Sequence, residues 1–537
     1  MKSRQIQGFT NNVQVELNKL VERQIRPWMR DCLQQHTGHE GCGTKDMNLV
    51  LPTRLIDVGN IDDNMVRLVD VKKCSDGHEF TYLILSYCWG TGNETSKTTE
   101  VKLEARLEGF EVSELAKTIQ DAILLTRTMG YRYLWVDAIC IIQGSRGDFQ
   151  SESSRMGDYY SNAECCISAS AASDSSEGFL RPRPIVRYPT ETFALRIAND
   201  SGDGPKHFVF RDNNNSPIFI KALLDSSLTQ RGWCLQETAL SKRILHWTLQ
   251  GLYLECSNSL FLEGSKIPWD RSWDNEAMPR TILARPNNDH LVTHGWCQLV
   301  SIFSETDLTY ETDRLYAIHG IASLLVERLK IEYFNGHFRF GLAHGLLWYH
   351  GNTKHSSFHY MRDEKPVEVS LPSWCWAFAC PVQHERIRQK PIFIHDDHPK
   401  RLRQWPTRPG DTSTVVSPVS KLYIRAPIIQ LVIGRKDLGY MVDESSGQQV
   451  NFECSFFLDR ERDVLKKMFH HGMGEEESVL WMPVGKQLHH DTNAVVGLLI
   501  YEVSGEDKGT YRRCGVLTYV DFANEELLMD LKEITLV

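Results

Sequence analysis

The apolar and polar positions predict strands that alternate with helices over the first half of the chain and a strand-rich last part. Short apolar runs bounded by polar or Gly-bearing segments predict strands at 51–58, 65–71, 82–86, 133–137 and 163–169. Helical spacing predicts helices over 113–130, with Ser113 as the N-cap, over 148–160, and again from Leu223. This order is typical of a mostly parallel sheet with helices on both faces, so we expect an α/β fold.

The same pattern divides the chain into four predicted parts. They are a helical N-terminal extension (1–50), the α/β domain (51–290), a mostly helical connecting region (291–400) and a β-rich C-terminal domain (401–537). A segment rich in Pro, Asn and Gly at 181–217 predicts a surface insertion in the α/β domain. The connecting region is expected to hold helices at 318–329 and 340–350, and the stretch 401–417 reads as a linker.

Composition narrows the class of protein. A chain of 537 residues predicts two or three domains, and 41% hydrophobic with 24% charged residues is typical of a soluble protein. The net charge of -9 argues against nucleic acid or an anionic membrane as the main partner. No apolar run approaches the roughly 20 residues that span a bilayer, and the N-terminus lacks a signal-peptide core. We therefore expect a cytoplasmic protein whose 14 cysteines are reduced thiols.

Three distant segments each place a tryptophan beside groups that can do chemistry. They are Leu83–Gly90, Tyr133–Gln143 and Arg231–Glu237. The first two read as buried strands with polar or Gly-bearing ends, and the third as the start of a helix. In an open α/β sheet, strand ends and helix starts converge on the ligand crevice. The sequence therefore predicts one site that contains Ser86, Trp89, Asp137 and Glu237.

Each of these residues also has a purely structural interpretation. Glu237 shares a helix face with Trp233, so it is either a solvated charge or a partly buried carboxyl that suits a cation-like transition state. Asp137 either points into the crevice or caps the next helix. Gly90 either lets backbone approach a ligand or makes a turn. Trp89 either stacks on a base or nicotinamide ring, or packs in the core.

The cysteines offer two further hypotheses. Cys88, Cys140 and Cys234 lie one in each segment, and no histidine is adjacent in sequence, which favours buried inert thiols over nucleophiles. A separate group could hold a tetrahedral zinc ion, although its spacing matches no common zinc finger. It consists of Cys32, His36, His39 and Cys42, and a weaker pair is formed by Cys74 and His78. Zinc at this separate group is left open, and no metal is expected at the site that contains Ser86, Trp89, Asp137 and Glu237.

The three segments, in this order, resemble the heterokaryon incompatibility (HET) domain of filamentous fungi. The family's blocks read L-S-Y-x-W-G, Y-L-W-[IV]-D-x-x-C-I-x-Q and R-[AG]-W-x-x-Q-E, and residues 85–90, 133–143 and 231–237 match them. Segments 312–317 and 372–377 also look like stretches of full-length fungal members, so the resemblance covers about residues 50–380.

The resemblance implies a role in non-self recognition and programmed cell death when incompatible hyphae fuse. The HET fold has been likened to the Toll/interleukin-receptor (TIR) domain, so the expected sheet is TIR-like, or flavodoxin-like. Trp233–Glu237 looks like the TIR W-C-x-x-E helix, whose glutamate is catalytic in NAD-cleaving members, and Leu83–Tyr87 resembles the first TIR strand. The long insertion at 171–230 has no counterpart in a compact TIR domain and leaves the cofactor geometry open.

By this resemblance, Glu237, Asp137 and Ser86 are the expected catalytic residues. Residues expected to contact the ligand are Trp89, Gly90, Tyr87 and Trp233. NAD would be a substrate, no cofactor is expected, and the partner would be another copy or another protein, not nucleic acid or a membrane. Two alternatives stay open: an enzyme of secondary metabolism built on the same scaffold, and a non-catalytic interaction module.

Overall fold

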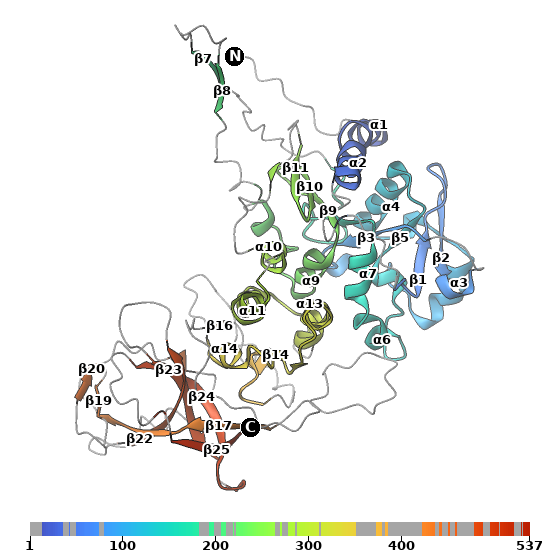
Figure 1. Ribbon diagram of the computed structural model, residues 1–537. Coiled ribbons are helices and arrows are strands. Elements are labelled where there is room, and N and C mark those ends of the chain that lie inside the picture. The colour runs from blue at the N-terminus through green and yellow to red at the C-terminus, as the bar shows by residue number, and fades with distance from the viewer. Residues whose placement is uncertain are drawn as a thin grey trace. The chain divides into compact units, whose positions relative to one another are not determined.

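Figure 1 presents a computed structural model of the chain, which consists of two compact units, Met1–Ala284 and Arg285–Val537. The structure describes residues 13–35, 42, 50–74, 80–181, 193–197, 206–210, 219, 222–263, 269–270, 278–284, 287–310, 313–350, 372–378, 382–384, 421–434, 440–442, 449–451, 457–458, 477–486, 495–503, 505–519, 528 and 530–537. The predicted division into four parts stays a prediction.

The first unit is built on a ten-stranded sheet of order β12-β11-β10-β9-β6-β3-β5-β1-β2-β4. These strands are β1 (Arg54–Asp57), β2 (Met65–Asp70), β3 (Tyr82–Ser86), β4 (Phe110–Glu111), β5 (Tyr133–Trp135), β6 (Cys165–Ser168), β9 (Arg243–Trp247), β10 (Leu252–Cys256), β11 (Ser259–Leu262) and β12 (Trp269–Asp270). The α/β class is therefore confirmed. The sheet is mixed, however: only the central strands β9, β6, β3 and β5 are parallel, and the strands outside them pair antiparallel.

The parallel strands follow the order β5-β3-β6-β9, which is the flavodoxin-like 2-1-3-4 order. The chain leaves β3 through helix α4 (Lys117–Met129) to β5, and then returns through α7 (Met156–Asn162) to β6 on the other side of β3. Right-handed crossovers in opposite directions put α4 and α7 on opposite faces of the sheet. The strand order reverses at β3, so the carboxyl end of β3 opens into the crevice of the sheet.

Helix α4 begins later than predicted. The sequence places its N-cap at Ser113, but the helix starts at Lys117, after a 3₁₀ turn at Val112–Glu114. The Ser113 hydroxyl donates instead to the Glu111 carboxylate at 2.9 Å. The predicted end is confirmed, because Gly130 takes the left-handed conformation that a C-cap requires.

The helix predicted over 148–160 is two helices, α6 (Phe149–Ser153) and α7. Serine hydroxyls in this stretch bond to backbone carbonyls: Ser151 to Asp148, Ser153 to Gln150 and Ser154 to Ser151. Such local bonds compete with helical ones, and they account for the break.

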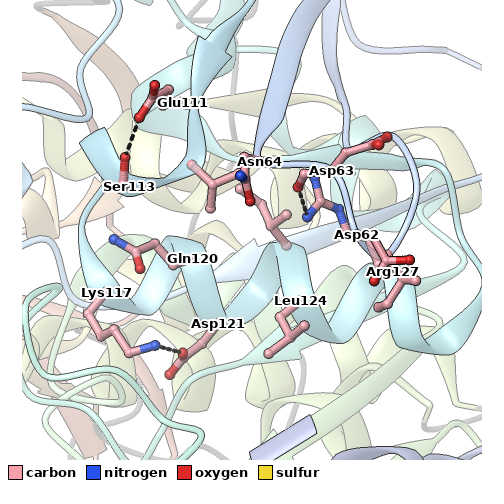
Figure 2. A pocket seen from close by; sticks show the side chains of 13 residues that line it. Asp62, Asp63, Asn64, Glu111, Ser113, Lys117, Gln120, Asp121, Leu124 and Arg127 are labelled. Atoms are coloured by element: carbon pink, nitrogen blue, oxygen red, sulfur yellow. Dashed lines mark hydrogen bonds and ion pairs between the residues drawn. The ribbon is translucent and has the colours of Figure 1, made fainter.

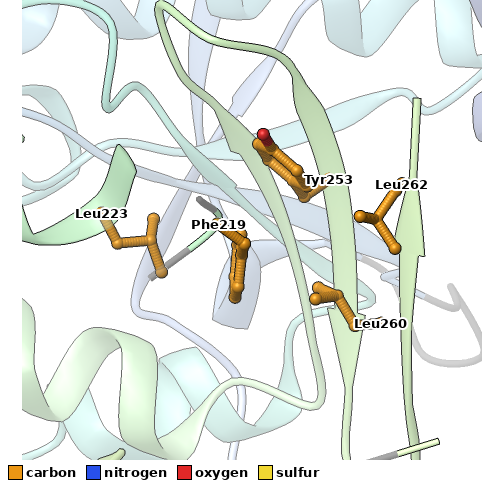
Figure 3. Close-up of a cluster of buried hydrophobic side chains, with 5 residues drawn as sticks. All are labelled: Phe219, Leu223, Tyr253, Leu260 and Leu262. Atoms are coloured by element: carbon orange, nitrogen blue, oxygen red, sulfur yellow. The ribbon is translucent and has the colours of Figure 1, made fainter. Parts of the chain in front are cut away.

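The antiparallel edge of the sheet carries its own apolar cluster. Figure 3 shows its side chains, which come from the β10–β11 hairpin and from the segment before the third block: Phe219, Leu223, Tyr253, Leu260 and Leu262. The Phe219 and Tyr253 rings lie 4.8 Å apart. Burying a side chain of this size contributes about 1.5–3 kcal/mol, so the cluster fixes the hairpin to the rest of the unit.

The N-terminal residues form the predicted helices. They are α1 (Val13–Leu20), a π-helical turn (Val21–Ile25) and α2 (Arg26–Gln35), and α1 packs on α4. In the predicted insertion at 181–217, the described strands β7 (Phe193–Ile197) and β8 (Lys206–Phe210) form an antiparallel pair. Helix α9 (Gly232–Leu240) follows and leads into β9.

The second unit begins with helices and ends with strands. Its longer helices are α12 (Trp296–Ser304) and α13 (Arg314–Leu329), the latter covering the predicted 318–329. The helix predicted at 340–350 is wrong in part: α14 (Leu342–Leu346) gives way to strand β15 (Trp348–His350). Trp348 is fully buried there, and its indole N–H donates to the Trp374 carbonyl at 3.1 Å, which favours the strand.

A nine-stranded sheet of order β17-β25-β24-β23-β22-β18-β19-β20, with β21 beside β24, confirms the predicted β-rich C-terminal part. Its strands are β17 (Leu422–Pro427), β18 (Ile429–Gly434), β19 (Tyr440–Val442), β20 (Gln449–Asn451), β21 (Phe457–Leu458), β22 (Glu477–Lys486), β23 (Val495–Glu502), β24 (Thr510–Tyr519) and β25 (Leu531–Leu536). The predicted linker at 401–417 lies outside the described residues. Of the helices in the described ranges, none has the length and apolar character needed to cross a membrane.

Candidate functional site

The carboxyl end of β3 meets helix α9 in the interior of the first unit. Ser86 is the last residue of β3, and Glu237 lies on the buried face of α9. The Ser86 hydroxyl donates a short hydrogen bond to Glu237 Oε2. Only 1% of Ser86 and 5% of Glu237 is exposed, and Cys234 Sγ lies 3.8 Å from Ser86 Oγ. The strand and the helix thus bring together two of the predicted catalytic residues.

Burial dominates the protonation of Glu237. It raises the pKa of this carboxyl from 4.5 to about 7, because removal from water disfavours the charged form. The Ser86 hydrogen bond opposes this shift, and the nearby negative charge of Asp137 adds to it. The Arg231 guanidinium and a hydrogen bond with Tyr160 favour the carboxylate. Near neutral pH, Glu237 is therefore balanced between its two protonation states.

Asp137 is the third predicted catalytic residue, and its carboxylate accepts two hydrogen bonds within the domain, although the N-cap of α5 is Val136 and not Asp137. It follows β5 as the first residue of the short helix α5 (Asp137–Cys140). Its Oδ1 accepts the backbone N–H of Ala138 at 2.7 Å, and its Oδ2 accepts the indole N–H of Trp89 at 2.8 Å. Burial raises the pKa of Asp137 to about 6, although the side chain is partly exposed, and Arg231 opposes the rise.

Tyr87 and Trp89 differ in what they offer a ligand. Tyr87 is 3% exposed, and its hydroxyl donates to Asn93 at 3.0 Å, so this side chain is already satisfied inside the protein. Trp89 is half-buried, and the Lys97 ammonium lies 5.4 Å from its ring centroid. Trp89 therefore lies at the edge of the Ser86–Glu237 site.

Gly90 is needed by the loop that follows β3. Its φ is 56° and its ψ is −162°, a region that other residues rarely adopt. A Cβ atom built here would lie 1.6 Å from Asp174 Oδ2. The Asp174 carboxylate also accepts the N–H of Thr91 at 2.9 Å. The structure thus supports the turn interpretation of Gly90, with Asp174 as the group that approaches its backbone.

Trp233 packs on a helix. It lies one turn before Glu237 on α9, is half-buried, and its ring meets the Phe149 ring of α6 edge to face with centroids 6.0 Å apart.

Arg231 is the residue that the sequence reasoning missed. It stands directly before α9, and its guanidinium donates a short hydrogen bond to the carbonyl of Tyr87. Its charge acts on both acids of the site, Asp137 and Glu237. One signal was available: Arg231 opens the third sequence block, and two buried acids call for a nearby cation.

One protein family matches the segment of the chain that runs from β3 to Glu237. Residues 82–237 match the family described as heterokaryon incompatibility protein (HET). The chain carries a HET domain. The match begins at the first residue of β3 and ends at Glu237 on α9, so the two elements that meet at the site lie at its two ends. No match was found among curated proteins or among solved structures.

The cysteines of the HET domain are buried, and none of the three predicted candidates is an activated nucleophile. Burial raises the pKa of Cys88, raises that of Cys140 to about 12, and raises that of Cys234 well above its ordinary value. Thiols of this kind stay protonated and inert, as the structural interpretation expects. In the predicted zinc group, Cys32 and Cys42 are buried, and His36, His39 and His78 lie outside the described residues.

A surface pocket of 610 Å³ shares no residue with the Ser86–Glu237 site. Figure 2 shows its walls, formed by the β1–β2 loop, β4 and α4. Both of its cations already have partners within the wall: Lys117 binds Asp121, and Arg127 donates to the Asp63 carbonyl at 2.7 Å. We therefore assign the pocket no role in the chemistry.

Proposed function

We propose that the HET domain is a cell-death effector of heterokaryon incompatibility, and that its Ser86–Glu237 site cleaves the nicotinamide–ribose bond of NAD. The observation that carries the proposal is a buried carboxyl, Glu237, whose pKa is raised to about 7 at the carboxyl end of β3. The strand order β5-β3-β6-β9 and the Trp-Cys-Leu-Gln-Glu start of α9 support the likeness to NAD-cleaving TIR domains.

The residue types suit this reaction. Breaking the bond leaves its electron pair on the nicotinamide nitrogen, which becomes neutral, and leaves an oxocarbenium-like ribose. Ionised Glu237 would stabilise this positive charge and hold the ribose hydroxyls. Water then adds to the ribose carbon and loses a proton to solvent, with Asp137 orienting the water or the ribose. Nicotinamide is a good leaving group, so no general acid is needed.

Glu237 is buried, so the proposed mechanism requires the site to open before substrate can reach it. The carboxyl is 5% exposed, whereas Trp89 and Asp137 at the rim are partly exposed. Substrate therefore reaches Glu237 only if the rim opens, and we propose that assembly of several chains promotes this opening. Activity should then rise more steeply than in proportion to protein concentration.

The test incubates the full chain with NAD over a wide range of protein concentration and measures nicotinamide by chromatography. We expect release by the wild type and at least a hundredfold loss in Glu237→Gln, which keeps the size of the side chain and a hydrogen-bonding oxygen for Ser86. The matched control is Glu152→Gln. Glu152 is also a buried carboxyl, 4% exposed, but it bonds Thr53 and Tyr159. Equal release by wild type and Glu237→Gln would refute the catalytic role.

The effector role has its own readout. Expression of the wild type in a filamentous fungus should arrest growth, while Glu237→Gln at equal protein level should not. Growth arrest by both the wild type and Glu237→Gln would show that toxicity does not depend on NAD cleavage at Glu237.

One observation favours a non-catalytic interaction module as the second candidate. The hydrogen bonds of Ser86, Glu237 and Trp89 are all made inside the domain, as they would be in a site that only holds β3, α5 and α9 together. In that case no nicotinamide is released at any concentration, and Glu237→Gln unfolds at lower denaturant concentration than Glu152→Gln. An enzyme of secondary metabolism on the same scaffold would instead need another substrate at the same residues.

A further inference from the structure

Three buried cysteines from distant parts of the first unit meet at one point. They are Cys32 on α2, Cys42 after it, and Cys256 at the end of β10. Their sulfur atoms all lie within 4.8 Å of one another, and the exposed fraction of each residue is at most 2%. Among the described residues the group has these three members.

The fold explains why they meet. In α2, Trp28 and Cys32 are four residues apart and share one face. The Trp28 ring lies 6.2 Å from the ring of Phe261, which pairs with Leu254 across the β10–β11 ladder. Cys256 lies two residues beyond Leu254 and so points to the same face of the sheet. The packing of Trp28 on Phe261 therefore places Cys32 next to Cys256.

Each of the three sulfurs also faces a hydrogen-bond donor. Arg243 is the ladder partner of Cys256, and its Nε lies 3.2 Å from Cys32 Sγ. The backbone N–H of Ser259 donates to Cys256 Sγ at 3.3 Å. Cys42 is hydrogen-bonded by the backbone of Ser257, in the same hairpin turn. Donors aimed at sulfur stabilise thiolates, and such bonds to sulfur are a regular feature of cysteine metal centres.

We propose that Cys32, Cys42 and Cys256 bind one zinc ion that joins helix α2 to the β10–β11 hairpin. Zinc bonds thiolate sulfur at about 2.3 Å in a tetrahedron, which sets the sulfurs roughly 3.8 Å apart, within the observed limit. Three thiolates and one Zn²⁺ carry a charge of −1, which the buried Arg243 guanidinium offsets. Binding releases the thiol protons to solvent. The fourth coordination position is left to a further donor.

The site is structural and independent of the reaction proposed at Glu237. A zinc ion here would close a loop of more than two hundred residues, because it would join Cys32 and Cys42 to Cys256. It would join the N-terminal helices to the antiparallel edge of the sheet. At this edge the β10–β11 hairpin also contributes Tyr253 to the apolar cluster of Figure 3. Side chains alternate between the two faces of a strand, and Tyr253 and Cys256 are three residues apart on β10. The apolar cluster and the zinc ion would therefore lie on opposite faces of the hairpin.

The test measures metal in the full chain, expressed with zinc and purified without chelator. We expect about one zinc per chain by elemental analysis in the wild type and less than a tenth in Cys32→Ser, Cys42→Ser and Cys256→Ser. Cys297→Ser is the control, because Cys297 is also a buried thiol, 8% exposed, and lies on α12 in the other unit. It should keep the full equivalent.

Where a variant fails to fold, the wild type alone decides. Cobalt replacing zinc should give the visible bands of tetrahedral Co²⁺ and sulfur-to-cobalt charge transfer, and X-ray absorption should count three sulfur neighbours. Chelation should lower the melting temperature of the first unit. The proposal is overturned by a wild-type chain that binds neither metal, by full zinc content in Cys256→Ser, or by a disulfide between two of these cysteines.

Discussion

The hydroxyl of Ser86, at the end of β3, hydrogen-bonds the carboxyl of Glu237 on α9 across 151 positions of the chain. One hydrogen bond thus connects the first and last elements of the HET match. It also opposes the effect of burial on the Glu237 pKa. The protonation of Glu237, the stability of the domain and any chemistry at the site are therefore coupled, and each can be measured separately.

The stability of the first unit should fall as pH rises from about 4.5 to 7. The pKa of Glu237 is 4.5 when unfolded and about 7 when folded, so the folded state holds a proton that the unfolded state has lost. Its contribution is complete below pH 4.5 and is lost as pH rises through 7, amounting to about 3 kcal/mol at most. Glu237→Gln should remove this dependence, as chemical denaturation at pH 5 and pH 8 would show. An unchanged difference between the two pH values would contradict it.

Ser86→Ala should extend that pH dependence to higher pH. The Ser86 hydroxyl lowers the Glu237 pKa, so its loss raises the pKa further and leaves a buried carboxyl with one partner fewer. We expect a destabilisation of about 1–3 kcal/mol near neutral pH. The control is Ser168→Ala. Ser168 is the ladder partner of Ser86 on β6, but its hydroxyl bonds Ser170 at 2.9 Å. An equal alkaline shift in both variants would show that Ser86 has no special effect on Glu237.

Much of this arrangement was predictable from sequence because it depends on local pattern. Apolar runs identified β3 and β5, and their polar ends placed Ser86 and Asp137 at the crevice. The antiparallel flanks of the sheet were not predictable, because a short strand carries the same pattern whichever way its neighbour runs. The role of Arg231 depends on two acids brought close only by folding.

The same distinction holds for the cysteines. The spacing of Cys32 and Cys42 suggested a metal site, but Cys256 is more than 200 positions away and joins them through the packing of Trp28 on Phe261. The start of α4 at Lys117, instead of at Ser113, shows a related limit. A serine predicts a cap only where no nearby carboxylate competes for its hydroxyl, and Glu111 does so here.

Trp89→Phe should raise the pKa of Asp137 above about 6. The indole N–H of Trp89 donates to Asp137 Oδ2 and lowers this pKa, whereas phenylalanine keeps the ring and loses the donor. We expect a loss of about 1–2 kcal/mol at pH 8, where Asp137 is ionised, and a smaller loss at pH 5. Trp233→Phe is the control, since the Trp233 ring contacts Phe149. Equal losses at both pH values would mean that Trp89 acts by packing alone.

Gly90→Ala tests whether the glycine of the first block serves the fold. An added Cβ would lie 1.6 Å from Asp174 Oδ2, and the φ of 56° with ψ of −162° is strained for alanine. We expect a destabilisation of about 2–4 kcal/mol by chemical denaturation, because backbone strain of this kind costs about 1–3 kcal/mol and the carboxylate must also move. Gly144→Ala is the matched control: its φ is 107°, but nothing lies within 4 Å of the added atom. The difference between the two variants isolates the clash with Asp174. If Gly90→Ala proves as stable as Gly144→Ala, the Asp174 side chain yields freely, and the requirement for glycine at position 90 lies in backbone conformation alone.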